Sequence, residues 1–147
     1  MDGLHHRFYV LRNKLRLHYW TNISTASPSP RQRQTLVILL HGFPDSALLW
    51  RYILSSHHLH EQSTLIAVDL PGSGGSDSFP NYRPGEFLEG LTEFIVAMRE
   101  KHLSAETSSM NKVFIVGHDW GCVVGFRLAA EAACLADRFI LSNAPHV

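Results

Sequence analysis

The chain has 147 residues, of which 45% are hydrophobic and 18% are charged, and its net charge is zero when the histidines are neutral. This length and composition predict one globular domain, and the balanced charge argues against nucleic acid or anionic lipid as a partner. Because no apolar run approaches the ~20 residues that span a bilayer and the N-terminus lacks the features of a signal peptide, we expect a cytoplasmic protein that does not enter a membrane.

Strands and helices alternate in the predicted order of elements. Two β-rich runs, 8–11 and 15–20, predict a hairpin, and a polar loop over 21–34 follows it. Continuous apolar runs predict buried strands at 35–42, 64–70, 112–117 and 137–145. Helices are predicted at 46–57, from Pro84 onward and at 120–133. This alternation predicts an α/β fold with a mostly parallel sheet and helices on both faces.

The two cysteines and a group of histidines are the candidates for a disulfide or a metal site. Cys122 and Cys134 fall in one predicted helix, roughly 18 Å apart at helical rise, so we interpret both as buried, reduced thiols that do not pair. His57, His60 and Glu61 share a helical face, but they lack the His-Glu-x-x-His order of a zinc site. A solvated helix end is the plainer interpretation, and we predict no metal and no cofactor.

The stretch VFIVGHDWGCVVG, residues 113–125, predicts a strand, a very tight turn and a buried helix. Gly117 and Gly121 stand two residues on either side of Asp119, where a strained strand-to-helix turn leaves no room for side chains. We predict Asp119 at the tip of this nucleophile elbow, with strained backbone angles. The alternative role for Asp119 is that of a helix N-cap.

The stretch HGFPD, residues 41–45, follows an earlier predicted strand and complements the elbow. The carboxyl ends of parallel strands meet at one edge of a sheet, where sites form. An elbow enzyme needs two N–H donors for an oxyanion hole, and those of Phe43 and Trp120 are the natural candidates. The residues expected to support the turn and the loop are His41, Gly42, Pro44, Gly117, His118 and Gly121. The plain alternatives are an ordinary turn at His41-Gly42 and simple packing of His118 and Trp120.

A third loop, DLPGSGGSD at residues 69–77, also follows a predicted strand. It lacks the Lys-Ser/Thr of a P-loop, and its glycines do not fit Gly-x-Gly-x-x-Gly. We interpret it as a tight structural turn near the site, with anion binding as the alternative.

These motifs, in this order and with the closing NAPH at residues 143–146, resemble the α/β-hydrolase-fold epoxide hydrolases over residues 7–146. The resemblance implies that Asp119 attacks an epoxide carbon and forms an aspartyl alkyl ester, which water then hydrolyses to a diol. It implies a small apolar epoxide as substrate. Haloalkane and haloacid dehalogenases of the same fold are the runner-up, but they generally carry Asn where this chain has Phe43, or Arg where it has Trp120.

Parts of the family's machinery have no match in this chain. The ring-opening tyrosines, on a cap domain, and the water-activating histidine belong to later positions, and Tyr52, Tyr82 and His146 do not match them. We therefore expect residues 1–147 to be the amino-terminal part of a single α/β-hydrolase domain, an inactive fragment by itself. A non-catalytic binding module is the alternative from a different class. An unprotected strand edge near 138–142 also predicts self-association.

Overall fold

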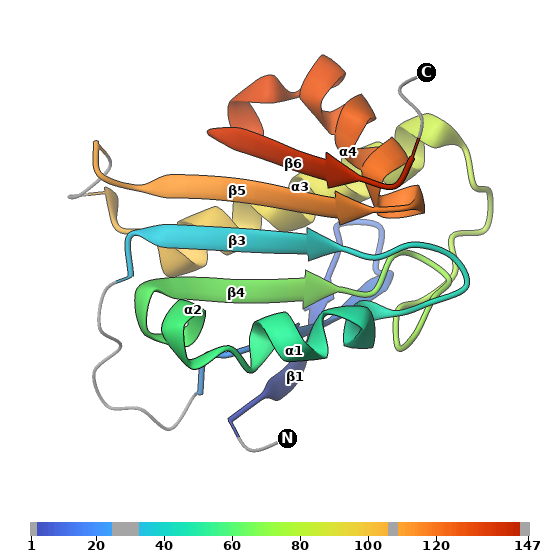
Figure 1. The fold of residues 1–147 in the computed structure, drawn as a ribbon. Coiled ribbons are helices and arrows are strands. Elements are labelled where there is room, and N and C mark those ends of the chain that lie inside the picture. The colour runs from blue at the N-terminus through green and yellow to red at the C-terminus, as the bar shows by residue number, and fades with distance from the viewer. Residues whose placement is uncertain (1–2, 25–32, 106–108, 145–147) are drawn as a thin grey trace.

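The computed structural model describes residues 3–24, 33–105 and 109–144. In this part of the chain six strands form one sheet in the order β1-β2-β4-β3-β5-β6 (Figure 1). The strands are β1 (His5–Val10), β2 (Arg16–Thr21), β3 (Thr35–Leu40), β4 (Ser63–Val68), β5 (Lys112–His118) and β6 (Arg138–Ser142). β1 pairs with β2 and β2 with β4 in antiparallel register, whereas β3, β4, β5 and β6 pair in parallel. The predicted α/β-hydrolase fold, with its mostly parallel sheet, is confirmed.

Helices cover both faces of the sheet, as predicted. The helical elements are η1 (Ala47–Trp50), α1 (Arg51–Leu54), α2 (His57–Gln62), α3 (Pro84–His102), α4 (Trp120–Glu131) and η3 (Ala133–Leu135). In Figure 1, α1 and α2 lie in front of the sheet, and α3 and α4 lie behind it. The helix predicted from Pro84 onward is α3, and its apolar stripe faces the sheet, since Leu88, Leu91, Ile95 and Met98 are buried there.

Two apolar clusters, one on each face of the sheet, explain the continuous apolar runs in the sequence. Leu36, Ile38 and Leu40 of β3 pack with residues of α3 and α4, while Leu39 of the same strand packs on the opposite face with Ala47 and Leu54. A strand that is covered on both faces needs apolar side chains at successive positions rather than at alternate ones. β4, buried at every residue, is the extreme case.

The single helix predicted at 46–57 is wrong. The chain instead forms η1, then α1, and then a separate α2. Ser55 ends α1, where its hydroxyl donates to the carbonyl oxygen of Arg51 at 2.7 Å, and Ser56 is extended. Serine side chains compete with the backbone for hydrogen bonds, so two in succession interrupt a helix.

The helix predicted at 120–133 ends earlier, at Glu131, because Ala132 leaves helical geometry with φ −144° and ψ 47°. Cys134 therefore lies in η3 and is exposed, whereas Cys122 is buried in α4. The prediction of a buried thiol is correct for Cys122 and wrong for Cys134. Neither cysteine forms a disulfide.

The histidine group near residue 60 lies on the short helix α2 and faces solvent. His57 and Glu61 approach to 3.8 Å on this exposed face. Within the described ranges, no three His, Cys, Asp or Glu residues gather as a metal site would require. A search of the same residues finds no helix that is long and apolar enough to cross a membrane.

The order of the strands places one pair of loops where sites form in such sheets. η1, α1 and α2 connect β3 to β4 on one face, and α3 connects β4 to β5 on the other. β3 and β5 are parallel neighbours, and the helices that follow them, η1 with α1 after β3 and α4 after β5, pack on opposite faces of the sheet, so the loops after both strands lie at the same edge. The loops after these two strands carry HGFPD and GHDWG.

Candidate active site

Asp119 stands between the end of β5 and the start of α4, at the tip of a tight turn. Its backbone is left-handed, with φ 56° and ψ −120°, which a non-glycine residue rarely adopts. Its carbonyl oxygen accepts the N–H of Cys122 at 2.9 Å and so begins α4, with Asp119 itself at the N-cap position of that helix. The predicted strain is confirmed, and Asp119 occupies the N-cap position of α4 without a side-chain capping hydrogen bond.

Glycine is required at positions 117 and 121 because backbone carbonyl oxygens lie where a side chain would be. A Cβ at Gly117 would lie 2.4 Å from the carbonyl oxygen of Gly121. A Cβ at Gly121 would lie 2.2 Å from the carbonyl oxygen of Leu40, at the end of β3. The turn thus packs against itself and against the neighbouring strand, as the glycine spacing predicted.

The loop after β3 meets the Asp119 side chain directly. The backbone N–H of Phe43 donates to Oδ1 of Asp119 at 3.0 Å. Gly42 makes this approach possible, since a Cβ there would lie 2.4 Å from both Cβ and Oδ1 of Asp119. The two motifs are far apart in sequence, and the structure brings them together at one carboxylate.

The hydrogen bonds on Asp119 favour its ionised form. The backbone N–H of Phe43, and after it that of Trp120, hold the pKa of Asp119 below its ordinary value of 3.8. Partial desolvation opposes this effect, and the nearby His118 ring adds to it. Donors fixed on a carboxylate stabilise its charge, so Asp119 is an anion near neutral pH.

The remaining predicted residues lie around this centre. His118 ends β5 and is half-buried, while Trp120 begins α4 with 58% of its surface exposed. Phe43 is 76% exposed, and its peptide bond to Pro44 is cis. The alternative that Trp120 is simply packed is wrong. Two aromatic rings therefore reach solvent beside one ionised carboxylate.

Comparison with models of protein families shows to which family this chain belongs. The model described as "Alpha/beta hydrolase family" matches residues 37–146, which include both loops of the site. The chain belongs to the alpha/beta hydrolase family.

Among alpha/beta hydrolases, this chain is similar to epoxide hydrolases, as the motifs indicated. It is 33% identical over 142 residues to a soluble epoxide hydrolase of Corynebacterium sp. (strain C12), covering 96% of this chain and 42% of that protein. It is 28% identical over 149 residues to epoxide hydrolase 2 of Caenorhabditis elegans, covering 99% of this chain and 36% of that protein. The chain thus spans well under half the length of these relatives.

Solved structures agree on the fold of this alpha/beta hydrolase. The crystal structure of an epoxide hydrolase from Vigna radiata superposes with a TM-score of 0.77 at 21% sequence identity. The match covers 100% of this chain and 40% of that one.

Sequence reasoning assigned no role to Asp69 and His18, which lie close to the site. The His18 ring and the Asp69 carboxylate are both buried and meet at 2.7 Å. One signal in the sequence was a carboxylate placed directly after an apolar strand and before a glycine-rich turn. Nothing local indicated the histidine, which lies 51 residues away.

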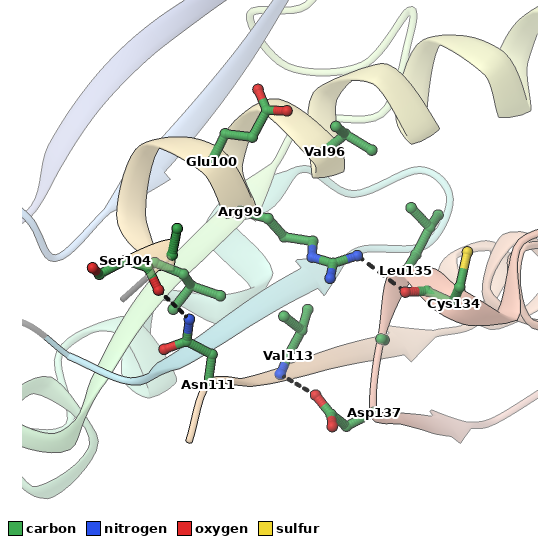
Figure 2. Close-up of a pocket in the computed structure, with 12 residues that line it drawn as sticks. Val96, Arg99, Glu100, Ser104, Asn111, Val113, Cys134, Leu135 and Asp137 are labelled. Carbon is green, nitrogen blue, oxygen red and sulfur yellow. Dashed lines mark hydrogen bonds between the residues drawn. The ribbon is translucent and has the colours of Figure 1, made fainter. Parts of the chain in front are cut away.

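A hollow of ≈ 640 Å³ lies at the opposite end of the sheet, between the end of α3, the start of β5 and η3 (Figure 2). Arg99 donates to the carbonyl oxygen of Cys134 at 3.0 Å, and Asp137 accepts the N–H of Val113 at 2.7 Å. These polar groups already bond to the protein itself, and the predicted site residues do not line the hollow.

Proposed function

We propose that this chain carries the nucleophile of an epoxide hydrolase and that Asp119 is that nucleophile. A carboxylate oxygen of Asp119 attacks a ring carbon of the epoxide, the bond from that carbon to the ring oxygen breaks, and the freed alkoxide takes a proton from water. The product is an aspartyl ester with a neighbouring hydroxyl group. The observation that supports this proposal best is the ionised carboxylate at the tip of a strained turn, held by the Phe43 N–H.

An aspartate suits this chemistry better than a serine does. A serine nucleophile acts on substrates that bring their own carbonyl, and an epoxide brings none. In the ester of Asp119 the carbonyl belongs to the protein, and water attacks it to release the diol. The N–H of Phe43, which donates to the carboxylate, and the N–H of Trp120, which also lowers its pKa, then serve as the oxyanion hole for that step. No cofactor is required, because every bond change uses only the carboxylate, water and protons.

The surroundings of Asp119 suit a small apolar epoxide. Phe43 and Trp120 expose aromatic surface on the two loops that meet at the carboxylate. Phe43 stands where haloalkane dehalogenases generally carry an asparagine for the leaving halide. The balanced charge of the chain offers no feature for a nucleic acid partner. The cytoplasmic location stays a prediction.

For the 147-residue polypeptide we propose ester formation without turnover. None of its histidines matches the position of the family's water-activating base, and neither Tyr52 nor Tyr82 matches the ring-opening acids. Each such group is typically worth a factor of about 10² to 10⁴ in rate. We therefore expect the ester of Asp119 to be hydrolysed more slowly than it forms.

Two reagents distinguish the candidate functions. The purified chain is incubated with a terminal aryl epoxide or with a primary bromoalkane, and intact mass and free diol are followed over time. We expect one added epoxide per chain, much slower addition of the alkyl group, and no steady diol production. Faster addition from the bromoalkane would favour a dehalogenase, and no addition from either reagent would favour a non-catalytic binding module. The variant Asp119→Asn is the control for addition at other residues.

A further inference from the structure

The carboxylate of Asp69 connects three segments of the chain that lie near the site. It follows β4, is only 2% exposed, and accepts three hydrogen bonds. Oδ1 accepts the N–H of Ala47 at 2.6 Å, and Oδ2 accepts the N–H of Gly75 at 2.8 Å and bonds Nδ1 of His18 at 2.7 Å. A buried carboxylate is costly without such partners, so this geometry is specific.

The glycine-rich turn is built around this carboxylate. Gly74 has φ +53°, and a Cβ there would lie 2.1 Å from Oδ2 of Asp69. A Cβ at Gly75 would lie 2.8 Å from Cγ of His18. The N–H of Gly75 already serves the protein's own anion, which favours the structural turn over the anion-binding alternative.

His41 makes a second connection between the loops after β3 and β4. Its Nε2 accepts the N–H of Leu70 at 2.9 Å, and its Nδ1 lies 2.7 Å from the carbonyl oxygen of Gly42. Since Nε2 is an acceptor, the ring proton is on Nδ1, which donates to Gly42. The buried imidazole thus anchors the start of the loop that carries Phe43.

The segment 42–47 is therefore held at both ends, by His41 at Gly42 and by Asp69 at Ala47. The N–H of Phe43 lies between these anchors and meets Asp119. We propose that Asp69, together with His41, is a positioning residue that keeps the Phe43 N–H on the Asp119 carboxylate. The use of this arrangement in catalysis rests on the proposed function, but the positioning itself is measurable without turnover.

The test is the pKa of Asp119, followed by NMR at the carboxyl carbon in the full chain. Asp69→Asn has nearly the same size but presents an NH₂ group to at least one of the backbone donors. If the segment is released, the hydrogen bond from Phe43 weakens and the pKa of Asp119 rises by about 1. The loss of a negative charge alone would lower that pKa, so the sign separates positioning from simple electrostatics.

Asp137→Asn is the matched control. Asp137 also accepts a backbone N–H, that of Val113, but at the opposite end of β5. Its substitution removes the same charge and a similar hydrogen bond, and the pKa of Asp119 should not rise. A second variant, Ala47→Pro, keeps the Asp69 carboxylate and removes only the N–H that it accepts. Ala47 is the first residue of η1, and Ser46 before it is extended, as a residue before proline should be.

The outcomes are distinct. A raised pKa of Asp119 in Asp69→Asn or Ala47→Pro, with no rise in Asp137→Asn, supports the proposal. An unchanged or lowered pKa in the folded variants overturns it. Loss of cooperative folding in both variants also overturns it, because the carboxylate would then hold the whole fold rather than one loop. Ester formation at Asp119, measured separately by mass spectrometry, tests the proposed function, so either idea can fail alone.

Discussion

The backbone N–H of Phe43 and Oδ1 of Asp119 are joined by a 3.0 Å hydrogen bond across 76 residues of sequence. This bond connects the loops that follow the neighbouring strands β3 and β5. It is the first cause of the lowered pKa of Asp119. The folded-state pKa lies below the ordinary 3.8, so the carboxylate stays ionised at neutral pH and loses its charge only as the pH falls through that lower value.

Replacing the Phe43 donor tests this relationship. Phe43→Pro removes the N–H, so the pKa of Asp119 should rise and the rate of ester formation at pH 4 should fall relative to the rate at pH 7. Phe43→Ala keeps the N–H and removes only the ring, and its ratio of rates should match that of the wild type. Intact-mass time courses at the two pH values measure both ratios. Equal ratios in all three proteins would show that this donor does not control the charge of Asp119.

The glycines of the elbow are predicted to tolerate no side chain. Gly117→Ala and Gly121→Ala place a Cβ 2.4 Å and 2.2 Å from carbonyl oxygens, and each should destabilise the fold by about 1–3 kcal/mol or more. Gly85→Ala is the matched control in the first turn of α3, where no atom lies within 4 Å of the new Cβ. It should be neutral or stabilising by up to about 1 kcal/mol. Urea unfolding compares the three, and equal stabilities would contradict the close approach.

The sequence predicted the strands and the elbow because their signals are local. An apolar run that ends at Gly117, followed by Asp119 and then by Gly121 and a second apolar run, predicts a buried strand, a tight turn and a buried helix. The strand bounds were predicted to within about three residues, and the meeting of HGFPD with the elbow followed from the rule that parallel strands share one carboxyl edge.

The remaining features depend on contacts that no local pattern encodes. His18 and Asp69 lie 51 residues apart, and only the pairing of β2 with β4 brings them together. Cys134 is exposed because Ala132 turns the chain out of α4, which residue propensities did not indicate. The break between α1 and α2, by contrast, has a local cause that the prediction overlooked, since Ser55 bonds the carbonyl oxygen of Arg51 in its own helix.

His102 is predicted to make stability depend on pH. Burial, and after it the charges of Lys101 and Arg7, lower its pKa from 6.5 to about 4, and its buried Nε2 finds no partner among the described residues. Between these two pH values the unfolded chain binds a proton that the folded chain rejects, so stability falls as the pH drops from 6.5 to about 4.

His102→Phe should remove much of this loss, on the order of 2 kcal/mol after allowance for the partial exposure of the ring. Denaturant unfolding at pH 7.5 and at pH 4.5 measures the loss in each protein. If the wild type and the variant lose the same free energy of unfolding on acidification, His102 is not the source of that loss.

The strand β6 is predicted to pair with a second copy of this chain. Within the described residues β6 pairs only with β5, and its Ile140 is 53% exposed. Antiparallel pairing centred on Ile140 would set Arg138 opposite Ser142 and Phe139 opposite Leu141, so no like charges meet. Ile140→Lys would set two lysines opposite each other and should shift the chain toward monomer in sedimentation velocity experiments. Tyr52 is an exposed aromatic residue on α1, so Tyr52→Lys is the matched control and should not shift the chain toward monomer.

The identity of the nucleophile is the central claim, and the position of the ester tests it most directly. The chain is treated with a terminal aryl epoxide, digested, and the modified peptide is located by tandem mass spectrometry. The exposed thiol of Cys134 can also react, so the experiment uses a Cys134→Ser background and a hydroxylamine step, which cleaves an ester but not a thioether or an alkylated imidazole. We predict one hydroxylamine-sensitive adduct on Asp119, absent from Asp119→Asn. An adduct confined to other residues, or equal labelling of Asp119→Asn, would contradict the assignment.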